Sequence, residues 1–187
     1  MKLTPKITRA LNKAATLHIG QIRKADGLPY IVHPVSVAMI LADYTKDEDV
    51  IAAGLLHDTL EDTEYSEEEM REEFGDRVAG FVTEVTEMDK SHPWIERKEA
   101  YLAHLEIASL EAKLVCGADK LHNLQSMRDA VRAFGVEIYG RFNAPADKKL
   151  WFYEQCVEVF KKDGRVPEEL IREIEGVVEE MRKLETK

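Results

Sequence analysis

The chain has little of several features that mark particular classes of protein. Only two of its 187 residues are cysteines, Cys116 and Cys156, and they do not form a CxxC motif. We interpret both as buried, reduced thiols of a cytoplasmic protein. No apolar run approaches the roughly 18 residues that a membrane span needs, and the first residues do not resemble a signal peptide. We therefore expect no membrane association.

Basic residues are also in the minority. The chain has 26 lysines and arginines against 36 aspartates and glutamates, a formal net charge of −10. This balance argues against duplex nucleic acid as a partner, because binding it needs a basic face. A small anionic ligand in a local basic pocket remains compatible with it. The length and a 44% hydrophobic content suit one globular domain over residues 1–187.

The spacing of apolar residues is helical nearly throughout, with no credible strand, repeat or low-complexity tract. Pro5 follows a capping Thr4, and Ser66 with Glu69 forms a capping box. One helix is predicted from about Glu48 to Leu60. The pattern predicts an all-α bundle of about eight to ten helices.

Towards the C-terminus, residues 135–145 contain two glycines and a proline and are predicted to form a loop. Residues 146–187 then carry two further helical patterns, the last of them amphipathic. We interpret these as packing helices that cover the rest of the bundle.

The stretch GLLHDTLEDTE, residues 54–64, places polar groups directly after an apolar approach. On one helix, His57, Asp58, Glu61 and Asp62 would project into one neighbourhood. Three carboxylates so close repel one another, and a divalent cation would offset that cost. The alternative is a helix end that turns to solvent and carries a capping histidine.

Two other stretches favour the metal site. His33 precedes a proline at the entry to a helix, although a single histidine in a turn is more often structural. Asp119, Asn123 and Ser126 share a helical face, and Asp119 again follows an apolar approach. Two histidines and two aspartates form a nitrogen and oxygen ligand set suited to Mn²⁺, Fe²⁺ or Zn²⁺, and too rich in nitrogen for Ca²⁺.

Four motifs in this order resemble the HD superfamily of metal-dependent phosphohydrolases. They are YIVHP, GLLHDTLEDT, FGDRVAGFVTEVT and ADKLHNLQSM. They are most similar to the hydrolase domain of RelA/SpoT-type (p)ppGpp hydrolases, and the length suits the stand-alone small alarmone hydrolases. The resemblance covers about residues 10–130 and implies an HD-domain helical bundle.

The resemblance implies a site residue by residue. One Mn²⁺ would be held by His33, His57, Asp58 and Asp119, and Glu61 with Asp62 would position the attacking water. Fe²⁺ or Zn²⁺ also suit these donors. The substrate contacts that the resemblance implies, the last two chosen from the divergent segment, are Arg23, Lys24, Asn123, Ser126, Lys148 and Tyr153.

Residues 132–146 match the family poorly, and the segment up to residue 153 would set the choice of base. Lys149 and Phe152 are the alternatives to Lys148 and Tyr153. The first interpretation is an enzyme that removes the 3′-pyrophosphate of (p)ppGpp and releases GDP or GTP. The alternative is a related phosphohydrolase acting on (p)ppApp, NADPH or a nucleoside phosphate. A non-catalytic nucleotide-binding module is the third, and it is disfavoured because Glu61 and Asp62 are both present. No sequence feature indicates an oligomeric state.

Overall fold

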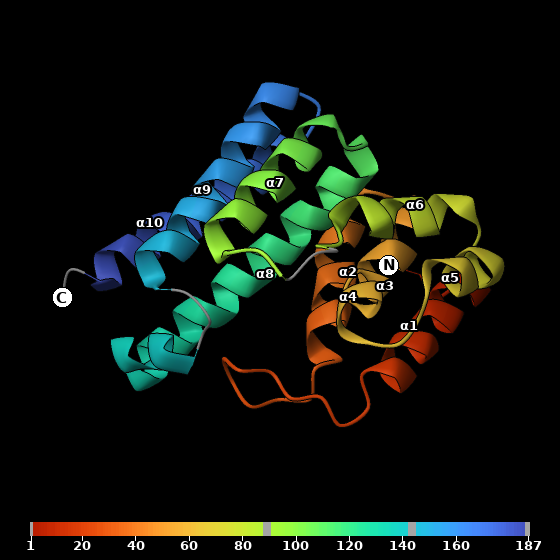
Figure 1. Ribbon diagram of the computed structural model, residues 1–187, viewed down its shortest axis with the longest axis horizontal. Helices are drawn as coiled ribbons and strands as arrows, with labels where there is room; N and C mark the ends of the chain where they lie inside the picture. The colour runs from red at the N-terminus through yellow and green to blue at the C-terminus, as the bar shows by residue number, and fades with distance from the viewer. Residues whose placement is uncertain (1, 88–90, 142–144, 186–187) are drawn as a thin grey trace.

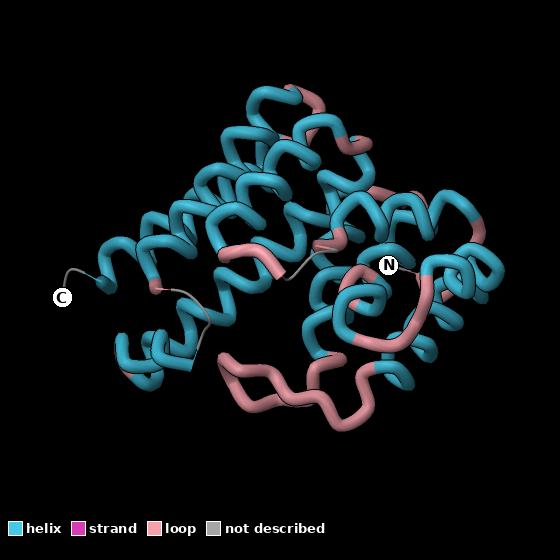
Figure 2. Tube along the Cα trace, viewed as in Figure 1, coloured by secondary structure: helices cyan, strands magenta, loops and turns pink. Residues whose placement is uncertain are grey.

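The computed structural model describes residues 2–87, 91–141 and 145–185. Within these ranges it contains α-helices joined by turns, one isolated β-bridge between Ile22 and Pro29, and no strand (Figures 1 and 2). The helices are α1 (Pro5–Leu17), α2 (Val32–Tyr44), α3 (Glu48–Leu56), α4 (Thr59–Asp62), α5 (Glu67–Phe74), α6 (Asp76–Val85), α7 (Trp94–Ile107), α8 (Leu110–Phe134), α9 (Ala146–Asp163) and α10 (Glu168–Glu185), with a 3₁₀ helix, η1 (Val136–Arg141), between α8 and α9. The expected all-α class is confirmed.

Side-chain caps begin the helices where the sequence predicts them. The Thr4 hydroxyl accepts a hydrogen bond from the Ile7 amide at the start of α1. Ser66 and Glu69 form both hydrogen bonds of a capping box at the start of α5. Each cap satisfies main-chain N–H groups that have no partner inside the helix.

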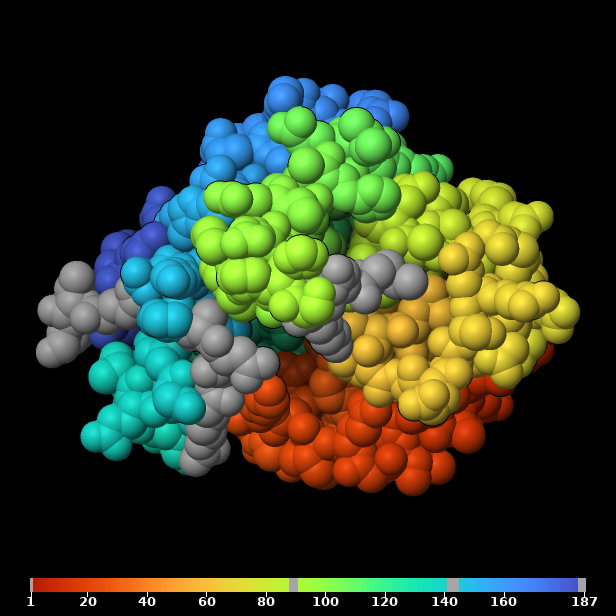
Figure 3. Space-filling model, in the orientation of Figure 1, coloured from red at the N-terminus to blue at the C-terminus, as the bar shows by residue number. Residues whose placement is uncertain are grey.

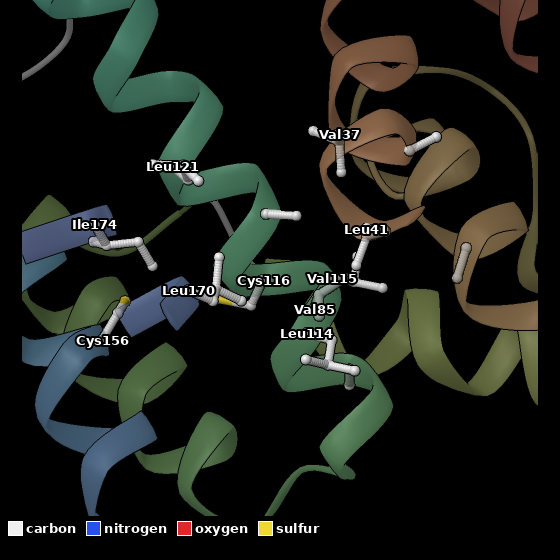
Figure 4. Packing of buried hydrophobic residues seen from close by; sticks show 14 of the residues in the cluster. Val37, Leu41, Val85, Leu114, Val115, Cys116, Leu121, Cys156, Leu170 and Ile174 are labelled. Carbon is white, nitrogen blue, oxygen red and sulfur yellow. The ribbon is translucent and has the colours of Figure 1, made fainter. Parts of the chain in front are cut away.

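The longest helix, α8, lies between the N-terminal helices and the C-terminal helices. Figure 1 shows α1 to α6 on one side of it and α9 and α10 on the other, and Figure 3 shows the same side with side chains filled in. In Figure 4, Val115 and Leu121 of α8 lie between Val37 and Leu41 of α2 and the side chains of α10. A helix that is apolar on several faces is stable only when covered on all of them. The centre of α8 is therefore held in place from both sides.

One expected helix is interrupted. The sequence pattern predicts a helix from about Glu48 to Leu60, but α3 ends at Leu56, a turn at residues 57–58 follows, and α4 covers only four residues. Here side chains form hydrogen bonds to main-chain carbonyls. His57 Nδ1 donates to the carbonyl of Gly54, 2.9 Å away, and the Thr59 hydroxyl donates to the carbonyl of Leu56. Such local bonds compete with the helical ladder, and periodicity alone does not reveal them.

The segment after α8 also differs from its prediction as a loop. Residues 136–141 form η1, and Ile138 is buried with only 3% of its surface exposed. η1 packs against α8, and Ile138 belongs to the buried hydrophobic core. Residues 142–144, which belong to the same predicted loop, lie outside the described residues.

Candidate active site

Two histidines and two aspartates converge between α2, α3 and α8. His33 Nε2 lies 3.2 Å from His57 Nε2, 3.4 Å from Asp58 Oδ2 and 3.1 Å from Asp119 Oδ1. His57 Nε2 is 3.1 Å from Asp58 Oδ2 and 3.6 Å from Asp119 Oδ1. Four donor atoms from three separate segments therefore surround one point.

A close approach of two helices brings the histidines together. A Cβ at Gly54 would clash with Leu41 Cδ1 of α2, so glycine lets α3 lie this close without a shift of the buried Leu41 side chain. His33 stands in the first turn of α2, and His57 directly follows α3. Both rings are almost fully buried, with 2% and 5% of their surface exposed. Asp119 reaches them from the middle of α8.

Each histidine has a partner for its second ring nitrogen. His57 Nδ1 donates to the Gly54 carbonyl, because a carbonyl can only accept. In the neutral ring its Nε2 then carries a lone pair that faces the other donors. Burial lowers the pKa of His57, but the Asp58 and Asp119 carboxylates outweigh it and raise that pKa well above its usual range, so a cation would have to displace a proton from Nε2. His33 Nδ1 lies 2.7 Å from His122 Nδ1. Such outer contacts fix the tautomer and the orientation of a histidine that binds a metal.

Each aspartate is held from outside as well. The Tyr30 hydroxyl donates to Asp58 Oδ2 at 2.6 Å. Asp119 accepts from the Lys120 ammonium at Oδ2, 2.6 Å away, and from the Asn123 amide at Oδ1, 2.5 Å away. The two carboxylates cannot rotate freely, so their oxygens stay directed at the histidines.

Electrostatics keep both carboxylates ionised. Burial by itself raises the pKa of Asp119, but the Lys120 ammonium and the two histidines outweigh it and hold the pKa well below its usual range. Burial likewise raises the pKa of Asp58. His57 and His33 outweigh it and hold the pKa of Asp58 well below its usual range. Ionised carboxylates and lone-pair nitrogens are what a metal ligand set requires.

The arrangement fits a divalent cation. The ligand atoms of His33, His57 and Asp58 all lie within 4.8 Å of one another. Donors that share one ion at about 2.1 Å lie about 3.0–3.4 Å apart, and the distances above are close to this range. Mixed imidazole and carboxylate donors suit Mn²⁺, Fe²⁺ and Zn²⁺.

A small cavity of about 50 Å³ opens beside the cluster. Glu61 lines it together with His57, Asp58 and Asp119. Glu61 Oε2 accepts a long hydrogen bond of 3.4 Å from the amide of Glu87, whose side chain is paired with Arg97 and Lys98 of α7. Glu61 thus stands at the edge of the donor cluster, anchored to the end of α6.

A larger cavity of about 310 Å³ includes Asp62 in its lining, whereas Glu61 lines the smaller one. The two acids are neighbours on α4, and adjacent residues of a helix point in different directions. The lining of the larger cavity also comes from the segment before α2, from α8 and from α9. It comprises Ile22, Arg23, Lys24, Ala25, Tyr30, Asp62, Asn123, Met127, Lys149 and Tyr153.

Positive charge gathers at this cavity although the chain as a whole is acidic. Burial, followed by the nearby charges of Lys98, Lys24 and Lys120, lowers the pKa of Lys149 to about 8. Lysines from three other segments therefore act on Lys149. Their repulsion disfavours its charged state, and an anion bound beside it would favour that state.

The expected substrate residues are placed unevenly. Arg23, Lys24, Asn123 and Tyr153 line the larger cavity, whereas Lys148 is exposed and its neighbour Lys149 lines the cavity. Ser126 accepts a 2.9 Å hydrogen bond from Arg23 and lines a separate cavity of about 350 Å³.

Arg23 itself is buried, with 7% of its surface exposed, and is paired with Asp26. It lines the larger of the two site cavities described above, and its partners Ser126 and Asp26 line the 350 Å³ cavity.

Three groups were not predicted from the sequence: Tyr30, His122 and Lys98. Tyr30 lies three residues before His33, and His122 lies three residues after Asp119, so each is one turn from a member of the cluster. That spacing is a usable signal. Lys98 is on α7, and only the packing of α7 against the rest brings it near the cluster.

Within the described ranges, none of the helices combines the length and the apolarity that a membrane span requires.

Comparison with known proteins gives a consistent result. A family model described as HD domain matches residues 10–143. The guanosine-3′,5′-bis(diphosphate) 3′-pyrophosphohydrolase MESH1 of Danio rerio is 44% identical over 127 residues, covering 66% of this chain and 70% of the relative. A GTP pyrophosphokinase of Streptomyces coelicolor is 43% identical over 129 residues, but the match spans only 15% of that longer protein. A solved structure of a metazoan orthologue of SpoT that hydrolyses ppGpp superposes with a TM-score of 0.77 at 29% identity, over 95% of this chain and 96% of that one.

Proposed function

Because the chain belongs to the HD domain family, we propose that it is a phosphohydrolase that removes the 3′-diphosphate from the guanosine alarmone (p)ppGpp. The products are GDP or GTP and pyrophosphate. One observation carries this proposal: the four converging donors lie beside two cavities, the smaller lined by Lys98 and Lys120 and the larger by Lys24 and Lys149. A substrate with two diphosphate groups needs both features.

The proposed ligands of a single divalent cation are His33, His57, Asp58 and Asp119. A cation held there would lower the pKa of water and offset negative charge on the phosphoryl oxygens. We propose Mn²⁺ as the ion, because two nitrogens and two carboxylates suit it and the outer hydrogen bonds hold all four groups in place.

Glu61 is the proposed general base. Its carboxylate lines the small cavity together with His57, Asp58 and Asp119, and it can accept a proton from the attacking water. The water oxygen bonds to the phosphorus that carries the ribose 3′-oxygen, and that oxygen departs and takes up a proton. Asp62 lines the larger cavity. It is proposed to orient the substrate and the attacking water there.

The nucleotide is proposed to occupy the larger cavity. Lys24 and Lys149 would bind its phosphates, and Asn123 would approach the ribose or phosphates from α8. Tyr153 adds an aromatic surface from α9. Arg23, with Ser126 bonded to it, would stack its flat guanidinium on the base. A nucleotide substrate and two buried thiols agree with an enzyme of the cytoplasm.

The test is direct hydrolysis. Purified protein with Mn²⁺ is incubated with ppGpp, and the release of pyrophosphate and GDP is measured. The same assay with ppApp, NADPH and nucleoside triphosphates ranks the alternatives by kcat/KM. Turnover of ppGpp with the highest kcat/KM is expected. Full metal occupancy without release of pyrophosphate would refute the proposed function.

A further inference from the structure

The two proposed histidine ligands are supported from outside by different kinds of group. His57 Nδ1 donates to a main-chain carbonyl, which has no proton to give. His33 Nδ1 instead faces another imidazole nitrogen, His122 Nδ1, at 2.7 Å, with the ring centroids 4.9 Å apart. At this distance one nitrogen must donate and the other must accept.

The surroundings of His33 decide the direction. Its Nε2 faces His57, Asp58 and Asp119 at 3.1–3.4 Å. A nitrogen that binds a metal uses its lone pair, so the proton of a neutral His33 must be on Nδ1. His122 Nδ1 is then the acceptor, and the proton of His122 is on its Nε2.

His122 can accept from His33 only while its own proton is on Nε2. Its side chain lines the 350 Å³ cavity together with Asp26 and Asp129. Both carboxylates are acceptors, although Asp26 is paired with Arg23 and Asp129 with Arg128. The support of His33 therefore depends on the tautomer of a second imidazole, whereas a main-chain carbonyl always accepts.

We propose that His122 is a positioning residue that holds His33 in the tautomer with the proton on Nδ1, and that it thereby sets the affinity of the site for a divalent cation. His122 does not touch the cation and acts through His33 alone. The inference rests on the proposed function, because it takes His33 as a metal ligand.

Two substitutions in the full chain test this role. In His122→Asn the amide oxygen can still accept from His33 Nδ1, whereas in His122→Leu nothing accepts and the His33 proton is free to move to Nε2. Mn²⁺ binding is measured from the electron paramagnetic resonance signal of the free ion. We expect binding about 10- to 100-fold weaker in His122→Leu and within about threefold of the wild type in His122→Asn. His104→Leu, at an exposed histidine of α7, is the control and should bind as the wild type does.

The outcomes separate the two proposals. If the wild type does not bind Mn²⁺, the metal centre itself fails, and this inference with it. If His122→Leu binds as tightly as the wild type, only the role of His122 fails. Equal weakening in both variants would show that the ring is needed for packing, which also overturns the inference.

A second measurement does not depend on any variant folding. Nitrogen–proton correlation spectra of the Zn²⁺-loaded wild type report the tautomer of each histidine. We expect the proton on Nδ1 of His33 and on Nε2 of His122, and the reverse assignment would refute the proposal.

Discussion

The donor cluster and the nucleotide cavity lie side by side but are built in opposite ways. The cluster is buried, and each of its four groups has an outer partner. It comes from α2, from α8 and from the turn after α3, all within the residues that the HD domain model matches. The cavity is more open, and Lys24 and Asp62 on its wall are exposed.

Part of the cavity wall comes from α9, which lies beyond the matched residues. The proposed chemistry therefore depends on the residues that the HD domain model matches, whereas the proposed fit to the substrate depends in part on α9. Substitutions in the cluster should therefore affect metal binding and kcat. Those in the cavity should mainly affect KM.

The largest effect is expected from Asp119→Asn. Loss of one carboxylate lowers the charge of the ligand set, and kcat/KM should fall by about 10³-fold or more together with Mn²⁺ binding. Enzyme kinetics and calorimetric Mn²⁺ titration would measure both. Arg132→Gln, at an exposed position of the same helix, should change neither. A similar loss in both variants would mean that α8 tolerates no charge change.

Glu61→Gln should lower kcat by about 10²- to 10³-fold and leave Mn²⁺ binding within about threefold, because a proton acceptor is lost but no proposed ligand. Single-turnover kinetics and metal titration separate the two quantities. Glu64→Gln, exposed in the same segment, is the matched control. If turnover survives Glu61→Gln, the assignment of the base is wrong.

Lys149→Met should raise KM for ppGpp by about tenfold with kcat nearly unchanged, since it removes one phosphate contact worth about 1.4 kcal/mol. Lys148→Met removes the same charge from the surface and should change KM by less than about twofold. Steady-state kinetics of the two neighbours show whether position or net charge matters. Equal effects would argue that general attraction of the anion dominates.

The smallest effect concerns pH. Burial, with the charges of nearby lysines, lowers the pKa of Lys149 to about 8, so this ammonium loses its proton as the pH rises past 8 whereas an ordinary lysine would keep it. Affinity for the anionic nucleotide should be constant below about pH 7, and KM should rise about fivefold by pH 9. Lys149→Arg stays charged and should show no such rise. If the wild type and Lys149→Arg give the same profile of KM against pH, Lys149 is excluded as the titrating group.

The sequence by itself determined the helical class, the helix caps and the residues of the donor cluster. Apolar spacing and capping residues act over a few positions, so local patterns reveal them. His33, His57, Asp58 and Asp119 could be read from three short motifs, because the proposed metal site needs these residue types, and the structure brings the four side chains together. These local signals do not depend on how distant segments pack.

Only the tertiary structure decided the rest. It ended α3 before His57, because a side chain competed with the main chain for the Gly54 carbonyl. It turned Lys149 into the cavity and left Lys148 at the surface. It also brought His122 against His33 across 89 positions of the chain. Contacts between α2 and α8 arise from packing around a shared core, and no periodicity along the chain encodes which side chains then meet.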